Sequence, residues 1–170
     1  MSLVIRSGKA ADIPALMALE HDAAQSYRAI GYDFCAEGAV RDAEEHKRAL
    51  RDGATFVAEI NAEPTGFILL WPADGRAHIA ELSVAQRFQQ QGIGRALIAA
   101  GESWAGEKGY RDITLTTFTE VPWNAPFYRS IGYKAFTLAP GDKDFAAIQA
   151  VEAAHGFHAK PRTAMIKHLP

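Results

Sequence analysis

Apolar residues recur at helical spacing in several segments of the chain. The clearest helix is predicted over 92–108, where one apolar stripe precedes Gly109 as a left-handed cap; its members are Ile93, Ala96, Leu97, Ala100 and Trp104. A helix that starts near Asp12 has Pro14 in its first turn. Further helices are predicted over 38–50, over 125–131 and over a last segment that ends near Gly156.

Strands are predicted where β-branched and aromatic residues cluster: 3–6, 55–60, 65–71, 77–84, 113–118, 133–138 and 163–168. The segment 61–64 between the second and third of these strands indicates a hairpin turn. The order strand, helix, strand over 77–118 is a βαβ unit, which requires two parallel strands joined by a right-handed crossover. The pattern is therefore typical of an α/β fold.

Length and composition restrict the class of protein. A chain of 170 residues is expected to form one domain over 1–170, of which 1–3 can be an expression remnant. The net charge of −2 offers no basic field for nucleic acid. The longest apolar run, 67–71, is too short to span a bilayer, and the N-terminus lacks signal-peptide order. We therefore expect a cytoplasmic protein without membrane or nucleic-acid partners, and its single cysteine, Cys35, excludes an internal disulfide.

The most informative stretch runs from Glu81 through a short turn to the predicted helix 92–108. A loop that enters a helix leaves several backbone N–H groups unpaired, with the positive end of the helix dipole behind them. Gly92 and Gly94 remove the Cβ atoms that would keep a pyrophosphate at a distance. The stretch indicates an anion site, and the alternative is a pair of glycines that serves only a tight turn.

Two other phosphate-binding patterns do not fit this stretch. A dinucleotide fingerprint needs a third glycine where Leu97 stands, and an acid near the end of the following strand, whereas Asp112 lies at that strand's beginning. A P-loop needs Gly-Lys-Ser/Thr, and here Gly94 is followed by Arg95 and Ala96.

Two motifs together resemble those of a known family. Gln89-x-x-Gly92-x-Gly94 after a Leu-Ser-Val strand resembles the acetyl-CoA signature of the GCN5-related N-acetyltransferase (GNAT) superfamily. The run 124–133 resembles its second signature, in which Tyr128 stands four residues before Gly132 and an aromatic residue. The matching order of elements covers 3–169, with a motif-bearing core over 76–136. The resemblance implies a three-layer GNAT-type fold, with a mixed central sheet of about six to seven strands and helices on both faces.

The resemblance also implies acetyl-CoA as co-substrate and assigns residues to it. The backbone of Leu82, Ser83 and Val84 would pair with the pantetheine arm. The pyrophosphate would be held by the backbone amides of Gln89, Gln90, Gln91, Gly92, Ile93, Gly94 and Arg95. Asn124 and Tyr128 would face the thiol end. No metal is expected, because His155 and His158 have metal-like spacing without a third ligand.

Acetyl transfer to an amine poses two proton problems. A lysine-like amine has a pKa near 10.4, so supplying its neutral form at pH 7 costs roughly 4.6 kcal/mol. Glu81, inside an otherwise apolar strand, is the candidate general base, and the alternative is a structural carboxylate that holds backbone or an arginine. Tyr128 is the candidate donor to the departing thiolate, and the alternative is a packed tyrosine.

The expected function is N-acetyl transfer from acetyl-CoA to a primary amine by direct attack in a ternary complex. A strand-edge N–H near Val84 would stabilise the oxyanion. A catalytically silent acyl-CoA-binding module and acyl transfer to a hydroxyl are the alternatives. The acceptor is expected to be a small-molecule or peptide amine, and the protein a monomer or a homodimer. The sequence specifies neither the acceptor nor any acyl preference beyond acetyl.

Overall fold

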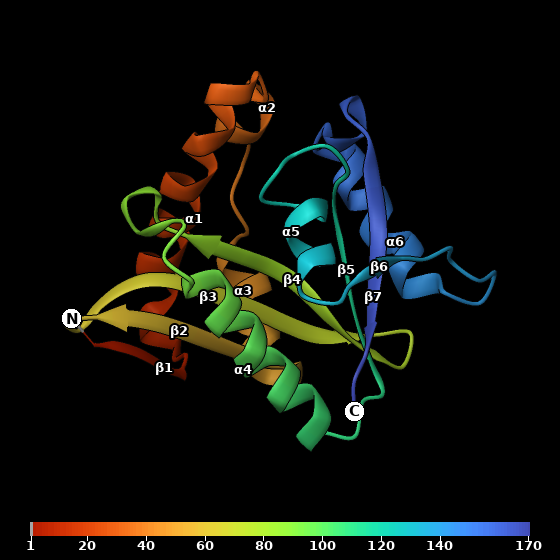
Figure 1. Cartoon of the computed structure of the whole chain (residues 1–170), viewed down its shortest axis with the longest axis horizontal. Helices are drawn as coiled ribbons and strands as arrows, with labels where there is room; N and C mark the ends of the chain where they lie inside the picture. The colour runs from red at the N-terminus through yellow and green to blue at the C-terminus, as the bar shows by residue number, and fades with distance from the viewer. Residues whose placement is uncertain (1) are drawn as a thin grey trace. The chain divides into compact units, whose positions relative to one another are not determined.

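The computed structural model describes residues 2–170, which form two compact units. Of these described residues, the first unit comprises 2–71 and Ile79–Trp104, and the second comprises Pro72–His78 and Ala105–Pro170. The strands follow the hydrogen-bonded order β1-β2-β3-β4-β5-β7-β6, and β4 contributes residues to both units (Figure 1). The expectation of one domain stays a prediction.

The first unit holds the N-terminal strands and helices. It contains all or most of β1 (Leu3–Ser7), the 3-10 helix η1 (Ala10–Asp12), α1 (Ile13–Ala24), the 3-10 helix η2 (Gln25–Ile30), α2 (Asp33–Ala36), α3 (Ala43–Asp52), β2 (Ala54–Ile60), β3 (Glu63–Ala73), β4 (Arg76–Val84), the 3-10 helix η3 (Gln86–Phe88) and α4 (Ile93–Glu107). The strands β1, β2 and β3 pair in antiparallel fashion. The first motif lies on the last residues of β4 and on the segment from Gln89 to the start of α4, and η3 connects these two parts.

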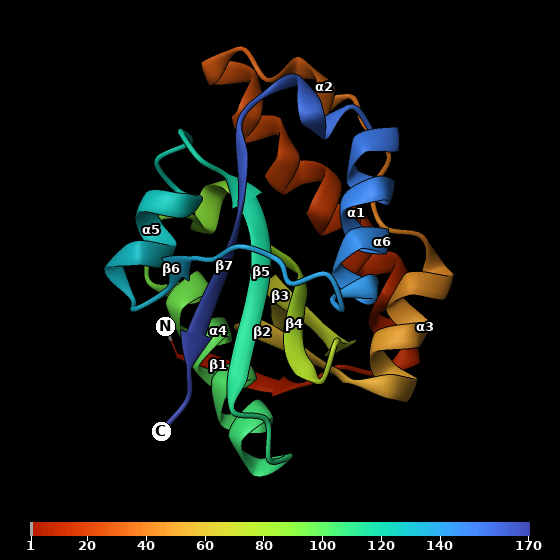
Figure 2. The same ribbon diagram turned by 90° about the vertical axis from the view of Figure 1, so that its right-hand side faces the viewer.

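Alternation along β3 determines which helices cover each face of this sheet. Phe67, Leu69 and Trp71 belong to the core that includes Leu16 and Leu19 of α1 and Ala49 of α3. Ile68 and Leu70 point to the other face, where a Cβ on Gly101 of α4 would come within 3.3 Å of both side chains. The strands therefore lie between α4 and the pair α1 and α3 (Figure 2).

The second unit is built on β5 (Asp112–Phe118) and β7 (Arg162–His168), which pair antiparallel along their whole length. The start of β4 pairs with β5 in parallel at Ala77–Ile113, and the two-residue β6 (Lys134–Ala135) pairs with β7. Thr116 contacts Glu152 of α6 (Lys143–Ala154), and Thr117 contacts Asn124, which precedes α5 (Ala125–Ser130). Successive strand residues point to opposite faces, so α5 and α6 cover different faces of β5 (Figure 2).

These elements confirm the predicted α/β class, the mixed sheet of six to seven strands, which has seven, and the parallel βαβ unit. Gly109 has φ 84°, as a left-handed cap requires. Among the described residues, no helix has both the length and the apolar character needed to cross a membrane.

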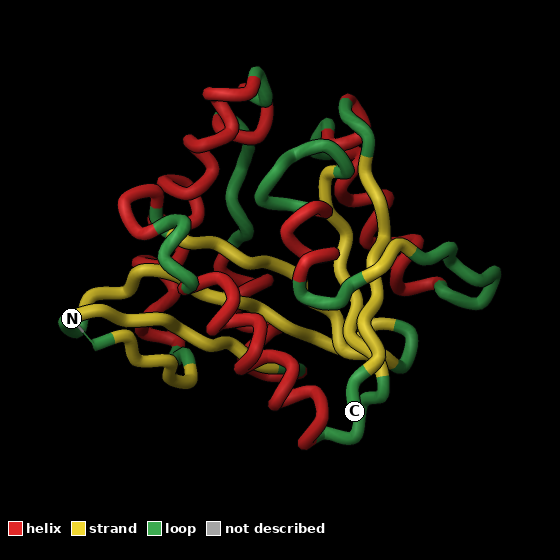
Figure 3. The backbone as a smooth tube through the Cα atoms, in the orientation of Figure 1, coloured by secondary structure: helices red, strands yellow, loops and turns green. Residues whose placement is uncertain are grey.

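Three predicted boundaries are wrong. The helix predicted over 38–50 begins at Ala43, because Asp42 caps it through a reciprocal capping box with Glu45, and 38–42 form a loop (Figure 3). The hairpin turn is shorter than 61–64: Asn61 and Ala62 both have positive φ, and β3 begins at Glu63. The strand predicted over 133–138 is reduced to the two residues of β6.

Candidate functional site

The first motif forms an amide-lined loop at the start of α4. Gln89 is extended, and Gln90 and Gly92 follow with φ of 61° and 83°. The N–H of Ala96 donates to the carbonyl of Gly92, so the preceding helical amides have no partner within the helix. These N–H groups, with the helix dipole behind them, suit a phosphate or pyrophosphate.

The two motif glycines leave open space beside these amides. A Cβ built on Gly92 meets no heavy atom within 4 Å, and one built on Gly94 comes no closer than 3.9 Å to Leu82 and Val84. The positive φ of Gly92 favours glycine for the turn itself. Packing does not require glycine at position 94, which favours room for a ligand over a purely structural role.

The neighbouring motif residues differ in exposure. Ser83 is buried, whereas Leu82, Val84 and Gln89 are half-buried. Ile93 is buried under the loop; the exposed members are Gln90, Gln91, Gly92 and Arg95. The side-chain amide of Gln91 donates to the carbonyl of Arg87 over 3.2 Å. The predicted backbone contacts of these residues with CoA stay predictions.

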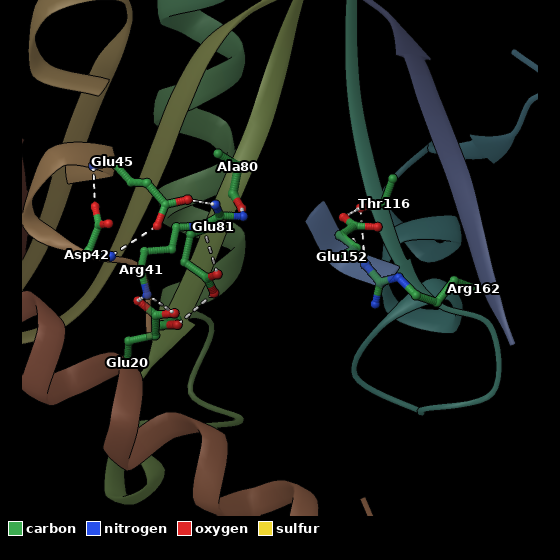
Figure 4. Close-up of polar contacts among 10 residues, drawn as sticks. Glu20, Arg41, Asp42, Glu45, Ala80, Glu81, Thr116, Glu152 and Arg162 are labelled. Atoms are coloured by element: carbon green, nitrogen blue, oxygen red, sulfur yellow. Dashed lines mark hydrogen bonds and ion pairs between the residues drawn. The ribbon is translucent and has the colours of Figure 1, made fainter. Parts of the chain in front are cut away.

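Glu81 belongs to a charged cluster around Arg41 in the first unit (Figure 4). Its Oε2 lies 3.4 Å from Nε of Arg41, and its Oε1 accepts a 3.0 Å hydrogen bond from Ser83. Arg41 also pairs with Glu45 at 2.8 Å and donates to the carbonyl of Ala80. The backbone N–H of Arg41 lies 3.1 and 3.2 Å from the two carboxylate oxygens of Glu20.

Burial raises the pKa of Glu81 above its ordinary value, and the positive charge of Arg41 opposes this shift. Burial, reinforced by the charge of Glu81, also raises the pKa of Glu20. Glu81 therefore has one feature of a general base, because the pKa of its carboxyl is raised. It also has one feature of a structural carboxylate, because it pairs with Arg41. Its role as a base stays a prediction.

The second motif lies in the second unit and is mostly buried. Tyr128 is only 7% exposed, and its ring packs edge-on against Tyr133 with centroids 5.7 Å apart. Asn124 precedes α5, and its Oδ1 accepts a 2.6 Å hydrogen bond from Thr117 of β5. The backbone N–H of Tyr128 donates to the carbonyl of Asn124, so one helical turn places both residues. Their roles at the thiol end stay predictions.

Sequence reasoning missed three residues around the candidate site. Arg41 pairs with Glu81, and Glu20 accepts the backbone N–H of Arg41. The hydroxyl of Ser26 donates to the Oε1 of Gln89 over 3.0 Å. Each contact joins residues far apart in the chain, and no local pattern marks them. The one signal readable in the sequence is the Asp42–Glu45 capping box, which places Arg41 immediately before the N-cap of α3.

Two other features contain none of the predicted site residues. In the second unit, Arg162 pairs with Glu152 at 3.3 Å and lies over the ring of Phe118, which fastens α6 to the sheet (Figure 4). A cavity of about 580 Å³ is lined by Gly106, Gly109, Tyr110, Arg111, Asp112, His168, Leu169 and Pro170. Within residues 2–170, no cluster of three or more His, Cys, Asp or Glu side chains could hold a metal ion.

The fold and the loop define an α/β protein in which an amide-lined helix start belongs to a parallel βαβ unit. The model of the acetyltransferase (GNAT) family matches residues 16–133, which is more than half of the chain. The chain therefore belongs to the acetyltransferase (GNAT) family.

Solved structures share this fold at low sequence identity. PaiA N-acetyltransferase from Thermoplasma acidophilum, in complex with coenzyme A, is 17% identical, with a TM-score of 0.70 over 99% of both chains. A GNAT-family acetyltransferase from Staphylococcus aureus Mu50 is 16% identical, with a TM-score of 0.73 over 99% of this chain and 100% of that one. The ribosomal-protein-S18-alanine N-acetyltransferase from Escherichia coli is 16% identical, with a TM-score of 0.69 over 99% and 94%.

Proposed function

We propose that the protein transfers an acetyl group from acetyl-CoA to a primary amine. The observation that carries the proposal is the loop 89–95, where unpaired helix amides and two open glycine positions follow the strand of Glu81. Family membership supports acetyl transfer in general. The coenzyme A complex of the T. acidophilum protein supports a CoA thioester as the donor.

The residues present fit CoA at this loop. The amides at the start of α4 would bind the pyrophosphate, and the backbone of 82–84 would pair with the pantetheine amides. Gly94 leaves room for the phosphates, since packing imposes no need for glycine there. Arg95 and Arg87 are the nearest positive charges in sequence and are exposed.

In the proposed reaction, one side chain would accept a proton and another would donate one. Glu81 would take a proton from the substrate ammonium, directly or through water, because burial raises the pKa of its carboxyl towards neutral pH. The amine would then attack the thioester carbonyl directly, with an N–H near Val84 stabilising the oxyanion. Tyr128 would donate its hydroxyl proton to the departing thiolate. Acetyl-CoA would supply the acetyl group, and no covalent enzyme intermediate is required.

The test combines binding and turnover. Acetyl-CoA at one hundred times its Kd should raise the free energy of unfolding by about 2.7 kcal/mol, measured as a thermal shift. CoA release should then appear with one or more members of a panel of small-molecule and peptide amines, and not with matched alcohols.

Each alternative has its own outcome in this test. No thermal shift with millimolar acetyl-CoA would refute the donor site. A shift without turnover on any amine would favour a silent acyl-CoA-binding module, and turnover on alcohols alone would favour a hydroxyl acceptor. A cytoplasmic location and a monomeric or dimeric state stay predictions.

A further inference from the structure

The side chain of Gln89 is directed into the protein, not towards the open side of the loop. Its Nε2 donates to the carbonyl of Val84 over 2.9 Å, and its Oε1 accepts from the hydroxyl of Ser26 over 3.0 Å. The opposite amide orientation would place Oε1 against the Val84 carbonyl, two acceptors face to face. Both ends of this side chain are therefore engaged inside the first unit.

The backbone next to Gln89 adopts a conformation that a side chain disfavours. Gln90 has φ 61°, the left-handed region, where residues other than glycine, asparagine and aspartate are uncommon. Such a conformation persists only where the surroundings determine it. The two bonds of Gln89 fix the residue immediately before this position.

Ser26 belongs to a segment that is distant from the loop in sequence but contacts it in the structure. It lies on η2, which continues α1, 63 positions before Gln89 in the chain. A second connection runs parallel to it: Asp22 of α1 accepts a 2.8 Å hydrogen bond from the backbone N–H of Gln86 in η3. The end of α1 and the start of η2 therefore hold both the approach to the loop and the loop itself.

We propose that Ser26 and Gln89 are positioning residues, which hold loop 89–95 in its strained conformation and thereby set its affinity for the phosphates of acetyl-CoA. Neither side chain needs to touch the ligand. The inference rests on the proposed function, and it assigns to Gln89 a role different from the backbone contact that the motif alone implies.

A double-mutant cycle on acetyl-CoA binding tests the pair. By calorimetry, Gln89→Ala should raise the Kd about 10-fold and Ser26→Ala about 3-fold, the range of one or two net hydrogen bonds. The double variant should bind no more weakly than Gln89→Ala, since Ser26 acts through Gln89. Gln86→Ala is the matched control, a glutamine of the same connector whose exposed side chain makes only a 3.4 Å contact, and its Kd should stay within about twofold of wild type.

A rescue variant separates positioning from direct contact. In the Gln89→Ala background, Gln90→Gly should lower the Kd again by about threefold, because glycine adopts a positive φ without support. A glutamine that acted by touching the ligand would not be rescued by a change at its neighbour. Lack of rescue, or additive effects of Ser26→Ala and Gln89→Ala, would overturn the proposal.

Hydrogen exchange provides a readout that needs no ligand. In the ligand-free protein, amides of 89–95 should exchange faster in Ser26→Ala and Gln89→Ala than in wild type, while amides of β2 stay unchanged. Unchanged exchange in the loop would overturn the inference. If wild type does not bind acetyl-CoA, the proposed function fails, and the exchange rates still decide whether the pair holds the loop.

Discussion

The two motifs differ in whether the main chain or the side chains are proposed to act. In the first unit, Gly92 and Gly94 present backbone amides beside open space, and the side chain of Gln89 is directed inwards. In the second unit, Tyr128 is buried against Tyr133, and Asn124 is bonded to Thr117. On the proposed function, the first motif would recognise its ligand through the main chain, whereas the second would contribute particular side-chain groups. Substitutions of different kinds should therefore disable the two motifs.

The largest effect is expected from Tyr128→Phe, which deletes the proposed donor and keeps the packed ring. Once an acceptor is found, steady-state kinetics should show kcat and kcat/KM reduced together by about 10² to 10⁴, the usual range for a general acid. Tyr133→Phe is the matched control, because it removes a hydroxyl from the neighbouring buried ring. Near-normal kcat for Tyr128→Phe, with chemistry rate-limiting, would leave Tyr128 as a packing residue.

Glu81→Gln tests whether a side chain of the first unit also takes part in the chemistry. It should lower kcat/KM by about 10² and keep the shape of the cluster around Arg41. Glu45→Gln removes another carboxylate partner of Arg41, 2.8 Å away, and should change stability by less than about 1 kcal/mol with little loss of turnover. Equal losses of activity in the two variants would indicate that Glu81 only holds Arg41.

The pH dependence of kcat/KM gives a second test of Glu81 as a base. A general base must be ionised, and burial raises the pKa of Glu81. Wild-type kcat/KM should therefore fall as the pH drops through this raised pKa, at a higher pH than for an exposed carboxylate. Glu81→Gln should lose this acidic limb, and a limb that persists in the variant would assign it to another group.

The smallest effect concerns the support of the second motif. Thr117→Val keeps the shape of a buried strand residue but removes the hydrogen bond to Oδ1 of Asn124. The free energy of unfolding should fall by about 1 kcal/mol, measured by denaturant titration. The same change at the half-buried Thr119 should cost less. A Thr117→Val variant as stable as wild type would show that this bond contributes little to the placement of Asn124.

Local patterns predicted most of the fold. The apolar stripe on α4 specifies a buried face, clusters of β-branched and aromatic residues indicate the strands, and the βαβ order then requires β4 and β5 to be parallel. Two of the three errors lie where a short local signal was missed. Asp42 and Glu45 form a capping box that starts α3, and the positive φ of Asn61 and Ala62 makes a two-residue hairpin turn.

The candidate site was less accessible to sequence reasoning than the fold. The glycines of the first motif were readable because an amide-lined loop needs a particular local sequence. The contacts of Glu81 with Arg41 and of Gln89 with Ser26 depend on how α1, α3 and β4 pack within the first unit. No periodicity or residue spacing in the sequence indicates such long-range pairs.

The central claim, that the main chain at the start of α4 binds acetyl-CoA, is tested most directly by calorimetry on two matched glycine variants. A Cβ at Gly94 or at Gly106 of the same helix meets no atom closer than 3.9 Å, so both valine variants should fold. Gly94→Val should weaken acetyl-CoA binding about 10- to 100-fold, because its side chain stands between the amides and the phosphates, whereas Gly106→Val should bind like wild type. An unchanged Kd in folded Gly94→Val would contradict the account.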